Sequence, residues 1–172
     1  MKFHAHSRKK PRGKANTMKI LLAVDESECS QAATQAVIAQ FPRERAEVRV
    51  LHADEWPKGL QTSVAFAEGP TAASDILGIR DEQRRQGNEL VSQAAWELKA
   101  AGFKTSTEDR EGDARHAILD VAEEWGPDVI VLGSHGRRGI DRFLLGSVSE
   151  SVVRHAPCSA DVVRAPSKPT QG

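Results

Sequence analysis

Five short strand-like segments recur along the chain and alternate with stretches in which apolar residues appear at helical intervals. The strand-like segments are residues 19–25, 47–53, 103–107, 128–132 and 160–164. The first and fourth are nearly continuous apolar runs, which are typical of strands buried on both faces of a parallel sheet. The alternation predicts an α/β domain with a single doubly wound, mainly parallel five-stranded sheet and right-handed crossovers that place helices on both faces.

The stretches between these segments carry helix start and stop signals. Ser27 can cap a helix that Pro42 stops, Asp113 can cap another, and Gly102 can end a long helix that begins at Asp75. In the long helix one side can carry an apolar stripe made of Ile76, Ile79, Leu90, Val91, Ala94, Leu98 and Ala101. Residues 54–74 show no sustained period, so we expect a long connection that acts as a flap. Residues 147–155 form the last expected helix.

The length and the distribution of charge limit the possible functions. A chain of 172 residues is long enough for one α/β domain. The formal net charge is zero, but residues 1–17 contain six basic residues and no acidic one, so the remainder carries about six net negative charges. An acidic body argues against broad nucleic-acid binding.

The two ends of the chain are expected to lie outside the folded domain. Residues 1–17 are interpreted as a disordered basic tail or as a mis-called start that precedes Met18, residues 18–166 as the domain, and residues 167–172 as a C-terminal tail. The apolar stretches have strand length and not membrane length, so we expect a cytoplasmic protein that does not engage a membrane.

The cysteines and histidines favour no metal site. Cys29 and Cys158 are too few for a disulfide framework, and we expect two small buried apolar side chains in a reducing compartment. The six histidines show no ligand spacing outside the first residues of the chain, so a structural metal is not expected.

The loop after the fourth strand contains glycines at notable spacing. Gly133 and Gly136 are separated by two residues, and nine more precede Gly146 and Ser147, which open the last helix. Glycines let backbone N–H groups approach phosphate oxygens, and a helix start offers unpaired N–H groups. In parallel sheets, ligands bind at the carboxyl ends of the strands. An alternative without a ligand is also open, since glycines punctuate loops and Ser147 with Glu150 matches a capping box.

At these residues the chain resembles the ATP-binding branch of the universal stress protein family, whose motif Gly-x2-Gly-x9-Gly-(Ser/Thr) it matches without a gap. The resemblance covers roughly residues 18–165, and residues 19–28, 50–53, 112–113 and 146–158 support it. It implies a Rossmann-like fold similar to that of the adenine nucleotide alpha hydrolases.

The resemblance implies a nucleotide site and a dimer. Ala23 and Asp25 would lie beside the adenosine, the backbone of Ala53 at the adenine edge, and Leu132 and Gly133 at the ribose. The residues around the phosphates would be Gly136, Gly146, Ser147, Val148 and Ser149. Ala23 stands where some relatives have proline. The family pairs its last strand in a homodimer, and Asp161 there departs from the usual apolar residue.

The resemblance therefore predicts an ATP-binding stress-response module in which Mg²⁺ or Mn²⁺ bridges the phosphates, with slow hydrolysis at most. One alternative is a true ATPase or an adenylyl-transferring enzyme, although no Walker motif and no nucleophile with an adjacent base is present. His135 is the best acid–base candidate, but a loop histidine without a second catalytic partner is the more economical interpretation. Another alternative is an interaction dimer that binds no nucleotide.

Overall fold

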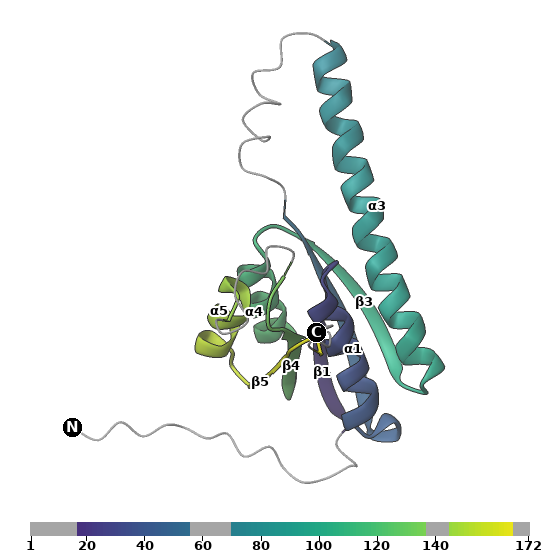
Figure 1. Cartoon of the computed structure of the whole chain (residues 1–172), viewed down its shortest axis with the longest axis vertical. Helices are drawn as coiled ribbons and strands as arrows, with labels where there is room; N and C mark the ends of the chain where they lie inside the picture. Colours follow the sequence, from purple (N-terminus) through teal and green to yellow (C-terminus); the bar gives the residue numbers. More distant parts are fainter. Residues whose placement is uncertain (1–16, 56–69, 137–144, 167–172) are drawn as a thin grey trace, which may run out of the picture.

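A computed structural model describes residues 17–55, 70–136 and 145–166 (Figure 1). The elements follow the predicted order of strands and helices. They are β1 (Met18–Ala23), α1 (Glu28–Gln40), a 3₁₀ turn (Arg43–Arg45), β2 (Ala46–Asp54), α3 (Pro70–Ala100), β3 (Lys104–Glu111), α4 (Ala114–Trp125), β4 (Val129–Gly133), α5 (Ser147–His155) and β5 (Ser159–Val163). The predicted tails and residues 56–69 of the predicted flap lie outside the described residues.

The five strands form one sheet in the order β3-β2-β1-β4-β5. Every pairing between them is parallel, and Ile20 of β1 stands opposite Val48 of β2 on one side and Val129 of β4 on the other. The α/β class and the doubly wound sheet are confirmed. The sheet is wholly parallel among the described strands, and β3 is an edge strand.

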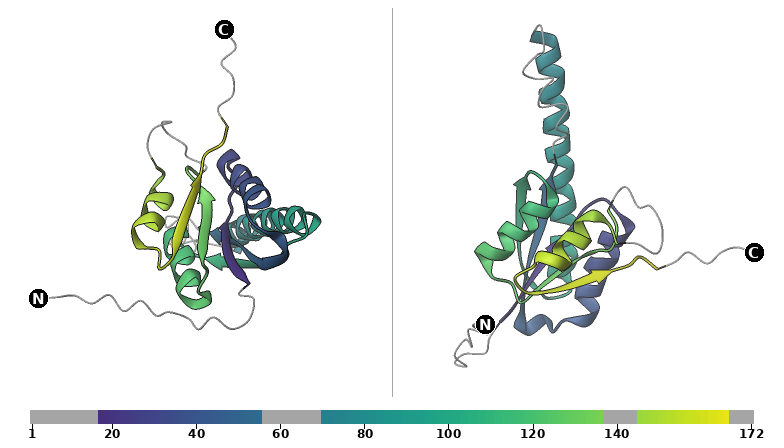
Figure 2. Two further views of the ribbon diagram at one scale, coloured as in Figure 1. Left: turned by 90° about the horizontal axis from the view of Figure 1, so that it is seen from below. Right: turned by 90° about the vertical axis from the view of Figure 1, so that its left-hand side faces the viewer.

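Helices cover both faces of the sheet (Figure 2). Ile20 and Leu22 of β1 point into a core that α1 and α3 close. Leu21, between them in sequence, points into a second core on the face of α4 and α5. All three side chains are fully buried, because successive strand residues face opposite sides and both sides are covered.

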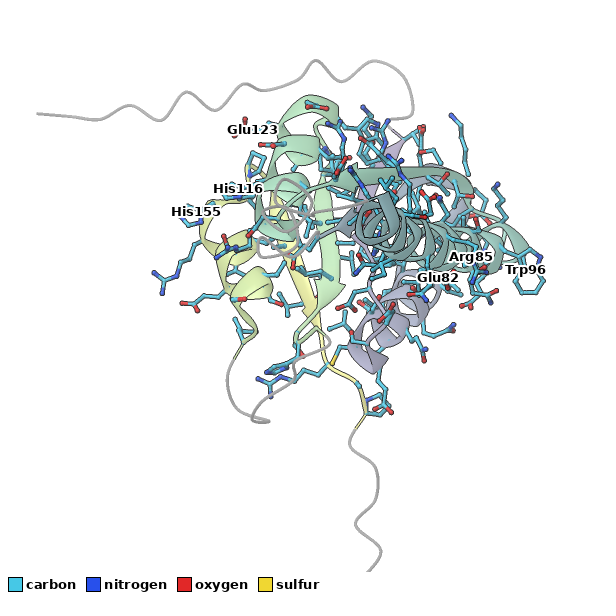
Figure 3. The ribbon with its side chains drawn as sticks, turned by 90° about the horizontal axis from the view of Figure 1, so that it is seen from above. Glu82, Arg85, Trp96, His116, Glu123 and His155 are labelled. Atoms are coloured by element: carbon cyan, nitrogen blue, oxygen red, sulfur yellow. The ribbon has the colours of Figure 1, made fainter. Side chains whose placement is uncertain are left out.

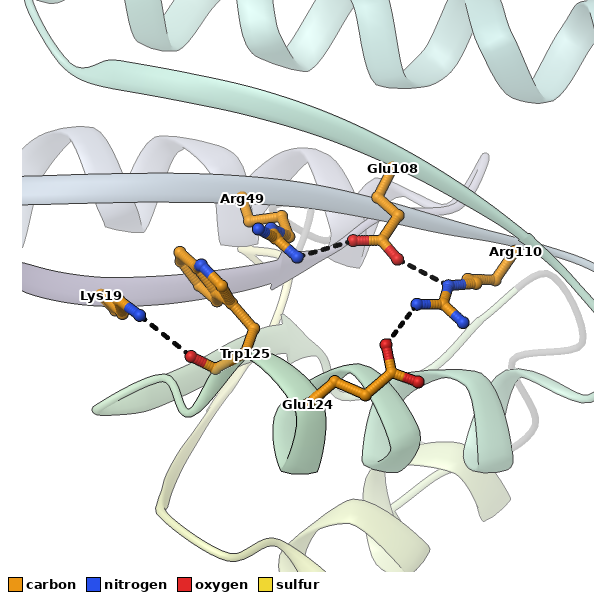
Figure 4. A network of polar contacts seen from close by, with 6 residues as sticks. All are labelled: Lys19, Arg49, Glu108, Arg110, Glu124 and Trp125. Carbon is orange, nitrogen blue, oxygen red and sulfur yellow. Dashed lines mark hydrogen bonds and ion pairs between the residues drawn. The ribbon is translucent and has the colours of Figure 1, made fainter.

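A chain of polar contacts joins β2 and β3 to α4 (Figure 4). Arg49 of β2 donates to Glu108 of β3 at 2.9 Å, and Arg110 links Glu108 to Glu124 of α4. The Arg49 guanidinium also lies 4.5 Å from the ring centroid of Trp125. The network ties the edge strand to α4 through charge-assisted and cation–π contacts.

The predicted helix caps are present in α1 and α4. The Ser27 side chain accepts a hydrogen bond from the N–H of Ser30, and the Asp113 carboxylate accepts one from the N–H of Arg115. Gly126 ends α4 with φ of 63°, a left-handed conformation that suits glycine. None of the described helices is long and apolar enough to cross a membrane.

Two expectations about α3 are wrong. The helix begins at Pro70 and not at Asp75, so residues 70–74 belong to it and not to the connection. Ile79 is 48% exposed, although Val91 and Leu98 of the same predicted stripe are buried. Arg80 pairs with Glu111, which is the last residue of β3. The residues of α3 that precede Arg80 therefore lie beyond the end of the sheet. Figures 1 and 2 show this part projecting from the body.

The prediction of two buried cysteines is also wrong, since both side chains are only partly buried. Cys158 precedes β5, and burial raises the pKa of its thiol, with a smaller contribution from the Asp128 charge.

Candidate functional site

The sheet reverses its winding between β1 and β4. The chain leaves β1 through α1 toward β2, whereas β4 lies on the other side of β1 and leads into α5 on the opposite face. Ala23 at the end of β1 stands opposite Leu51 of β2 and Leu132 of β4. Ala53 lies two residues further along β2. The carboxyl ends of three strands therefore meet at the switch point, where open α/β sheets bind ligands.

Asp25 follows β1 and is held by the start of α1. Its Oδ1 accepts hydrogen bonds from the N–H of Ser27 at 3.0 Å and from the Ser27 hydroxyl at 2.5 Å. Its own N–H donates to the hydroxyl of Ser30 at 2.9 Å. The other carboxylate oxygen, Oδ2, lies 2.7 Å from where a Cβ on Gly136 would stand. The structure thus brings the two predicted site residues Asp25 and Gly136 into direct proximity.

Gly133 is required by the packing of α1 on β4. A Cβ at this position would stand 2.8 Å from Cβ of Cys29 and 2.9 Å from its carbonyl carbon. A Cβ on Gly146 would meet the carbonyl oxygen of Ser134 at 3.2 Å, although its φ of −64° is open to any residue. These glycines therefore permit close approach of the chain to itself.

Ser149 locks the beginning of the loop to α5. The side chain is buried, and its hydroxyl lies 2.7 Å from the carbonyl oxygen of Gly133 and 3.1 Å from that of Ser134. The N–H of Gly146 donates to the same Ser134 oxygen at 2.8 Å, and the N–H of Ser134 donates to Val163 of β5 at 2.7 Å. The hydroxyl of Ser149 is thereby engaged in positioning the loop.

The start of α5 differs from the capping box that Ser147 and Glu150 suggested, and that interpretation is wrong. Gly146 is the N-cap residue, no side chain caps the helix, and Glu150 pairs with Arg154 at 2.7 Å. The first intrahelical bond runs from the N–H of Glu150 to Gly146. Within the described part of the chain, the N–H groups of residues 147–149 thus precede the first helical bond and have no side-chain cap.

An open hollow of about 450 Å³ lies beside the loop, where α1 begins. Its lining residues are Glu26, Ser27, Glu28, Cys29, His135, Gly136 and Ala165. Nδ1 of His135 lies 3.1 Å from the Ser134 hydroxyl, which is 3.6 Å from Sγ of Cys29. Nε2 of His135 is buried and has no partner among the described residues. The contact between Nδ1 of His135 and the Ser134 hydroxyl therefore joins His135 to its neighbour in the loop.

The structure brings most of the expected site residues to one edge of the sheet, at the ends of β1, β2 and β4 and at the start of α5. Two contributors were missed by sequence reasoning, Ser30 and Ser134, which hold Asp25 and the loop in place. Ser134 stands between two motif glycines, which was a usable signal, whereas nothing distinguished Ser30. Arg137, Arg138 and Arg142, expected to add positive charge, lie outside the described residues.

Comparison with known proteins decides the family. The model of the universal stress protein family matches residues 16–164. The chain belongs to the universal stress protein family. Among its relatives, the universal stress protein YxiE of Bacillus subtilis is 30% identical over 146 residues, which cover 85% of this chain and 98% of YxiE.

Solved structures support the same fold. The universal stress protein UspA from Lactobacillus plantarum superposes with a TM-score of 0.71 at 25% identity, over 88% of this chain and 100% of that one. A member from Arabidopsis thaliana, solved with AMP bound, has a TM-score of 0.63 at 18% identity, over 90% and 97%. One from Archaeoglobus fulgidus, in complex with dAMP, has a TM-score of 0.59 at 22% identity, over 86% and 98%. Some structural neighbours in the family thus bind adenine nucleotides.

Proposed function

We propose that this universal stress protein binds ATP in the crevice between β1 and β4 and acts as a nucleotide-dependent regulatory module in the stress response, with slow hydrolysis at most. Mg²⁺ or Mn²⁺ would bridge the phosphates. The observation that carries the proposal is the start of α5, where three N–H groups without a side-chain cap follow Gly146. Such a helix start attracts anions through its N–H groups and its dipole.

The crevice offers distinct places for the parts of the nucleotide. Asp25 has a carboxylate fixed by Ser27, suited to accept hydrogen bonds from ribose hydroxyls. The backbones of Ala23, Ala53, Leu132 and Gly133 would face the adenosine. Gly136, Gly146, Ser147, Val148 and Ser149 would surround the phosphates. Because its hydroxyl is bonded to carbonyls, Ser149 would contribute through its N–H.

The similar structures with AMP and dAMP support an adenine nucleotide. Their ligands share adenine, a sugar and one phosphate, and a helix start with three available N–H groups can accommodate more than one phosphate. Calorimetry with ATP and with AMP measures both affinities, and the proposal requires that ATP bind more tightly than AMP.

Ser147→Pro provides the sharpest test of the site. Proline is favoured at the first helical position, and Gly146 has φ of −64° and ψ of 156°, as a residue before proline requires. The substitution removes one N–H and leaves the fold intact. Losing a charge-assisted hydrogen bond of about 1.5–3 kcal/mol should weaken ATP binding by roughly 10- to 150-fold. Calorimetry gives the affinity and a thermal melt the stability.

Ser147→Ala is the matched control, because it removes the hydroxyl and keeps the N–H. It should weaken ATP binding much less than the proline variant. Equal affinities of wild type and Ser147→Pro, with equal melting temperatures, would refute the site at α5. Repeating the titration with EDTA tests the divalent cation, and phosphate release over hours tests hydrolysis.

We also propose a cytoplasmic homodimer that pairs through β5. Among the described strands, β5 is hydrogen-bonded only to β4, so its outer edge is available for a second copy. Asp161 within it is partly buried and would weaken such pairing unless its carboxylate meets a base or water. Sedimentation of wild type and Asp161→Val tests this, and the variant should form the tighter dimer.

A further inference from the structure

The backbone of Ala53 is directed into the space beyond the end of β1. The N–H of Val24 donates to the carbonyl oxygen of Leu51 at 2.9 Å, so Leu51 points its backbone groups toward β1. Alternate residues of a strand point their backbone groups the same way, so Ala53 also directs its N–H and its carbonyl toward β1. Because β1 ends at Ala23, opposite Leu51, Ala53 faces the crevice of the proposed nucleotide site.

Three hydrogen bonds fix the turn that follows Ala53. The N–H of Glu55 donates to the carbonyl oxygen of Ala53 at 3.1 Å. On the other side, the N–H of Gly112 donates to the carbonyl oxygen of Asp54 at 3.0 Å. The N–H of Ala114, the first residue of α4, donates to Oε1 of Glu55 at 2.8 Å. These three bonds, called the clamp here, join the end of β2 to the chain between β3 and α4.

Gly112 takes part in the clamp through its backbone conformation. Its φ is 130°, a value that residues with a side chain rarely adopt, whereas a Cβ there would meet no atom within 4 Å. Glycine is therefore needed for the shape of the chain and not for close packing. This accounts for Gly112, one of the residues on which the family resemblance rests.

The first N–H groups of α4 are occupied by carboxylates of the chain itself. Glu55 accepts from the N–H of Ala114, and Asp113 accepts from the N–H of Arg115 at 3.0 Å. At the start of α5, in contrast, the described residues supply no side-chain cap. A helix start that already holds carboxylates is a poor site for a further anion. The start of α4 thus serves to anchor the end of β2.

The clamp lies at the surface of the molecule. The Glu55 residue is exposed, and the side chain of His116, in the first turn of α4, is 79% exposed. Figure 3 shows His116 on the side of the molecule opposite to Arg85 of α3. A substitution of Glu55 therefore leaves the two apolar cores closed, and the fold should tolerate it.

We propose that Glu55 is a positioning residue for recognition of the adenine base, an inference that rests on the proposed nucleotide site. With its carboxylate on the N–H of Ala114, Glu55 holds the backbone of Ala53 in one position beside the base. The Ala53 N–H can donate, and its carbonyl oxygen keeps a second lone pair besides the bond from Glu55.

A fixed N–H and carbonyl can distinguish adenine from guanine. The edge of adenine carries a ring nitrogen that accepts a hydrogen bond next to an amino group that donates one. Guanine carries a ring N–H at the first place and a carbonyl oxygen at the second, so its donor and acceptor are exchanged. Polar groups of a site that are held in place reject the wrong pattern, and groups that can move away reject it less.

Glu55→Ala and Glu55→Gln form the central comparison, in which calorimetry gives the dissociation constants of ATP and GTP. In Glu55→Ala the preference for ATP over GTP should fall by about three- to tenfold, the effect of one ordinary hydrogen bond. Glu55→Gln keeps an acceptor oxygen for Ala114 and should keep most of the wild-type preference. A preference in Glu55→Ala equal to that of wild type, or to that of Glu55→Gln, would overturn the proposal.

Asp113→Ala is the matched control for the stability of α4. It removes the other carboxylate at the start of the helix, whose described contacts are with Arg115 and His116 and not with β2. It should lower the melting temperature at least as much as Glu55→Ala and keep the wild-type preference for ATP. An equal loss of preference in Asp113→Ala would assign the effect to α4 as a whole and overturn the role of Glu55.

Ser147→Pro separates this inference from the nucleotide site itself. It should weaken ATP and GTP alike, because both nucleotides carry the same triphosphate. A wild-type chain that binds neither nucleotide would refute the proposed function and the role of Glu55 together. Wild-type binding of ATP with an unchanged preference in Glu55→Ala would refute the role of Glu55 alone.

Discussion

The crevice between β1 and β4 and the part of α3 before Arg80, called the arm, differ in how closely the chain surrounds their glycines. In the crevice a Cβ on Gly133 would collide with the backbone of Cys29, whereas a Cβ on Gly78 in the arm would meet no atom within 4 Å. Ser149 in the crevice is buried and bonded to two carbonyls, whereas Ser74 in the arm is exposed. The crevice is fixed by its own packing, whereas the described side chains of the arm are exposed.

The difference bears on the proposed nucleotide site. A phosphate site requires N–H groups that are already in position before the ligand arrives, because reorganisation on binding costs affinity. The contacts of Asp25, Ser134 and Ser149 hold the crevice in this way. The arm exposes Leu77 and Ile79 and has no comparable packing among its described residues. The two regions can therefore be altered separately.

The same substitution in both regions should give the largest contrast. Gly133→Ala forces a Cβ to within 3 Å of Cys29, where backbone atoms must move, and should destabilise the fold by about 2–3 kcal/mol. Gly78→Ala gains helix propensity at no steric cost and should stabilise it by about 0.5–1 kcal/mol. Urea unfolding measures both free energies. Similar values for the two variants would show that the close packing at Gly133 is not maintained in solution.

Two serines give a smaller contrast of the same kind. Ser149→Ala leaves the carbonyls of Gly133 and Ser134 short of a buried donor and should cost about 1–2 kcal/mol. Ser74→Ala on the arm should change the free energy of unfolding by a few tenths of a kcal/mol at most. If Ser149→Ala lowers the free energy of unfolding no more than Ser74→Ala does, the Ser149 hydroxyl does not hold the loop against α5.

The sequence was a good guide to the sheet and the caps. Continuous apolar runs such as residues 20–24 can only be covered on both sides, so they predicted central parallel strands. Ser27 and Asp113 precede helical patterns and were confirmed as caps, since their hydrogen bonds are local. The glycine spacing located the loop, although the neighbours that require Gly133 and Gly136 are more than a hundred residues away in the sequence.

Features that depend on the end of another element were not predictable. The stripe through Ile79 follows the same spacing as Val91, yet only the latter has a sheet beneath it. The length of β3 determines which residues of α3 are buried, and the sequence of α3 contains no sign of that length. Similarly, Ser147 with Glu150 has the spacing of a capping box. The N-cap residue is nevertheless Gly146, whose N–H donates a hydrogen bond to the carbonyl oxygen of Ser134. Tertiary contacts override the local pattern in both cases.

The smallest expected contrast concerns two carboxylates with lowered pKa. Hydrogen bonding to Arg115 lowers the pKa of Asp113 at the start of α4, and hydrogen bonding to Arg85 lowers that of Glu82 on α3. A lowered pKa adds stability that is complete above the pKa of the unfolded chain and is lost as the pH falls toward that of the folded one.

Asp113→Asn keeps a good cap and removes the charge, so it isolates this contribution. The side chain is 27% exposed, and solvent screening should limit the loss to about 0.5 kcal/mol at pH 7. The difference from wild type should shrink below about pH 4, where the unfolded carboxyl takes up its proton. Glu82→Gln on the exposed side of α3 should give no measurable pH-dependent difference. Urea unfolding at pH 7, 4 and 3 measures both, and a constant difference for Asp113→Asn would assign its effect to the cap alone.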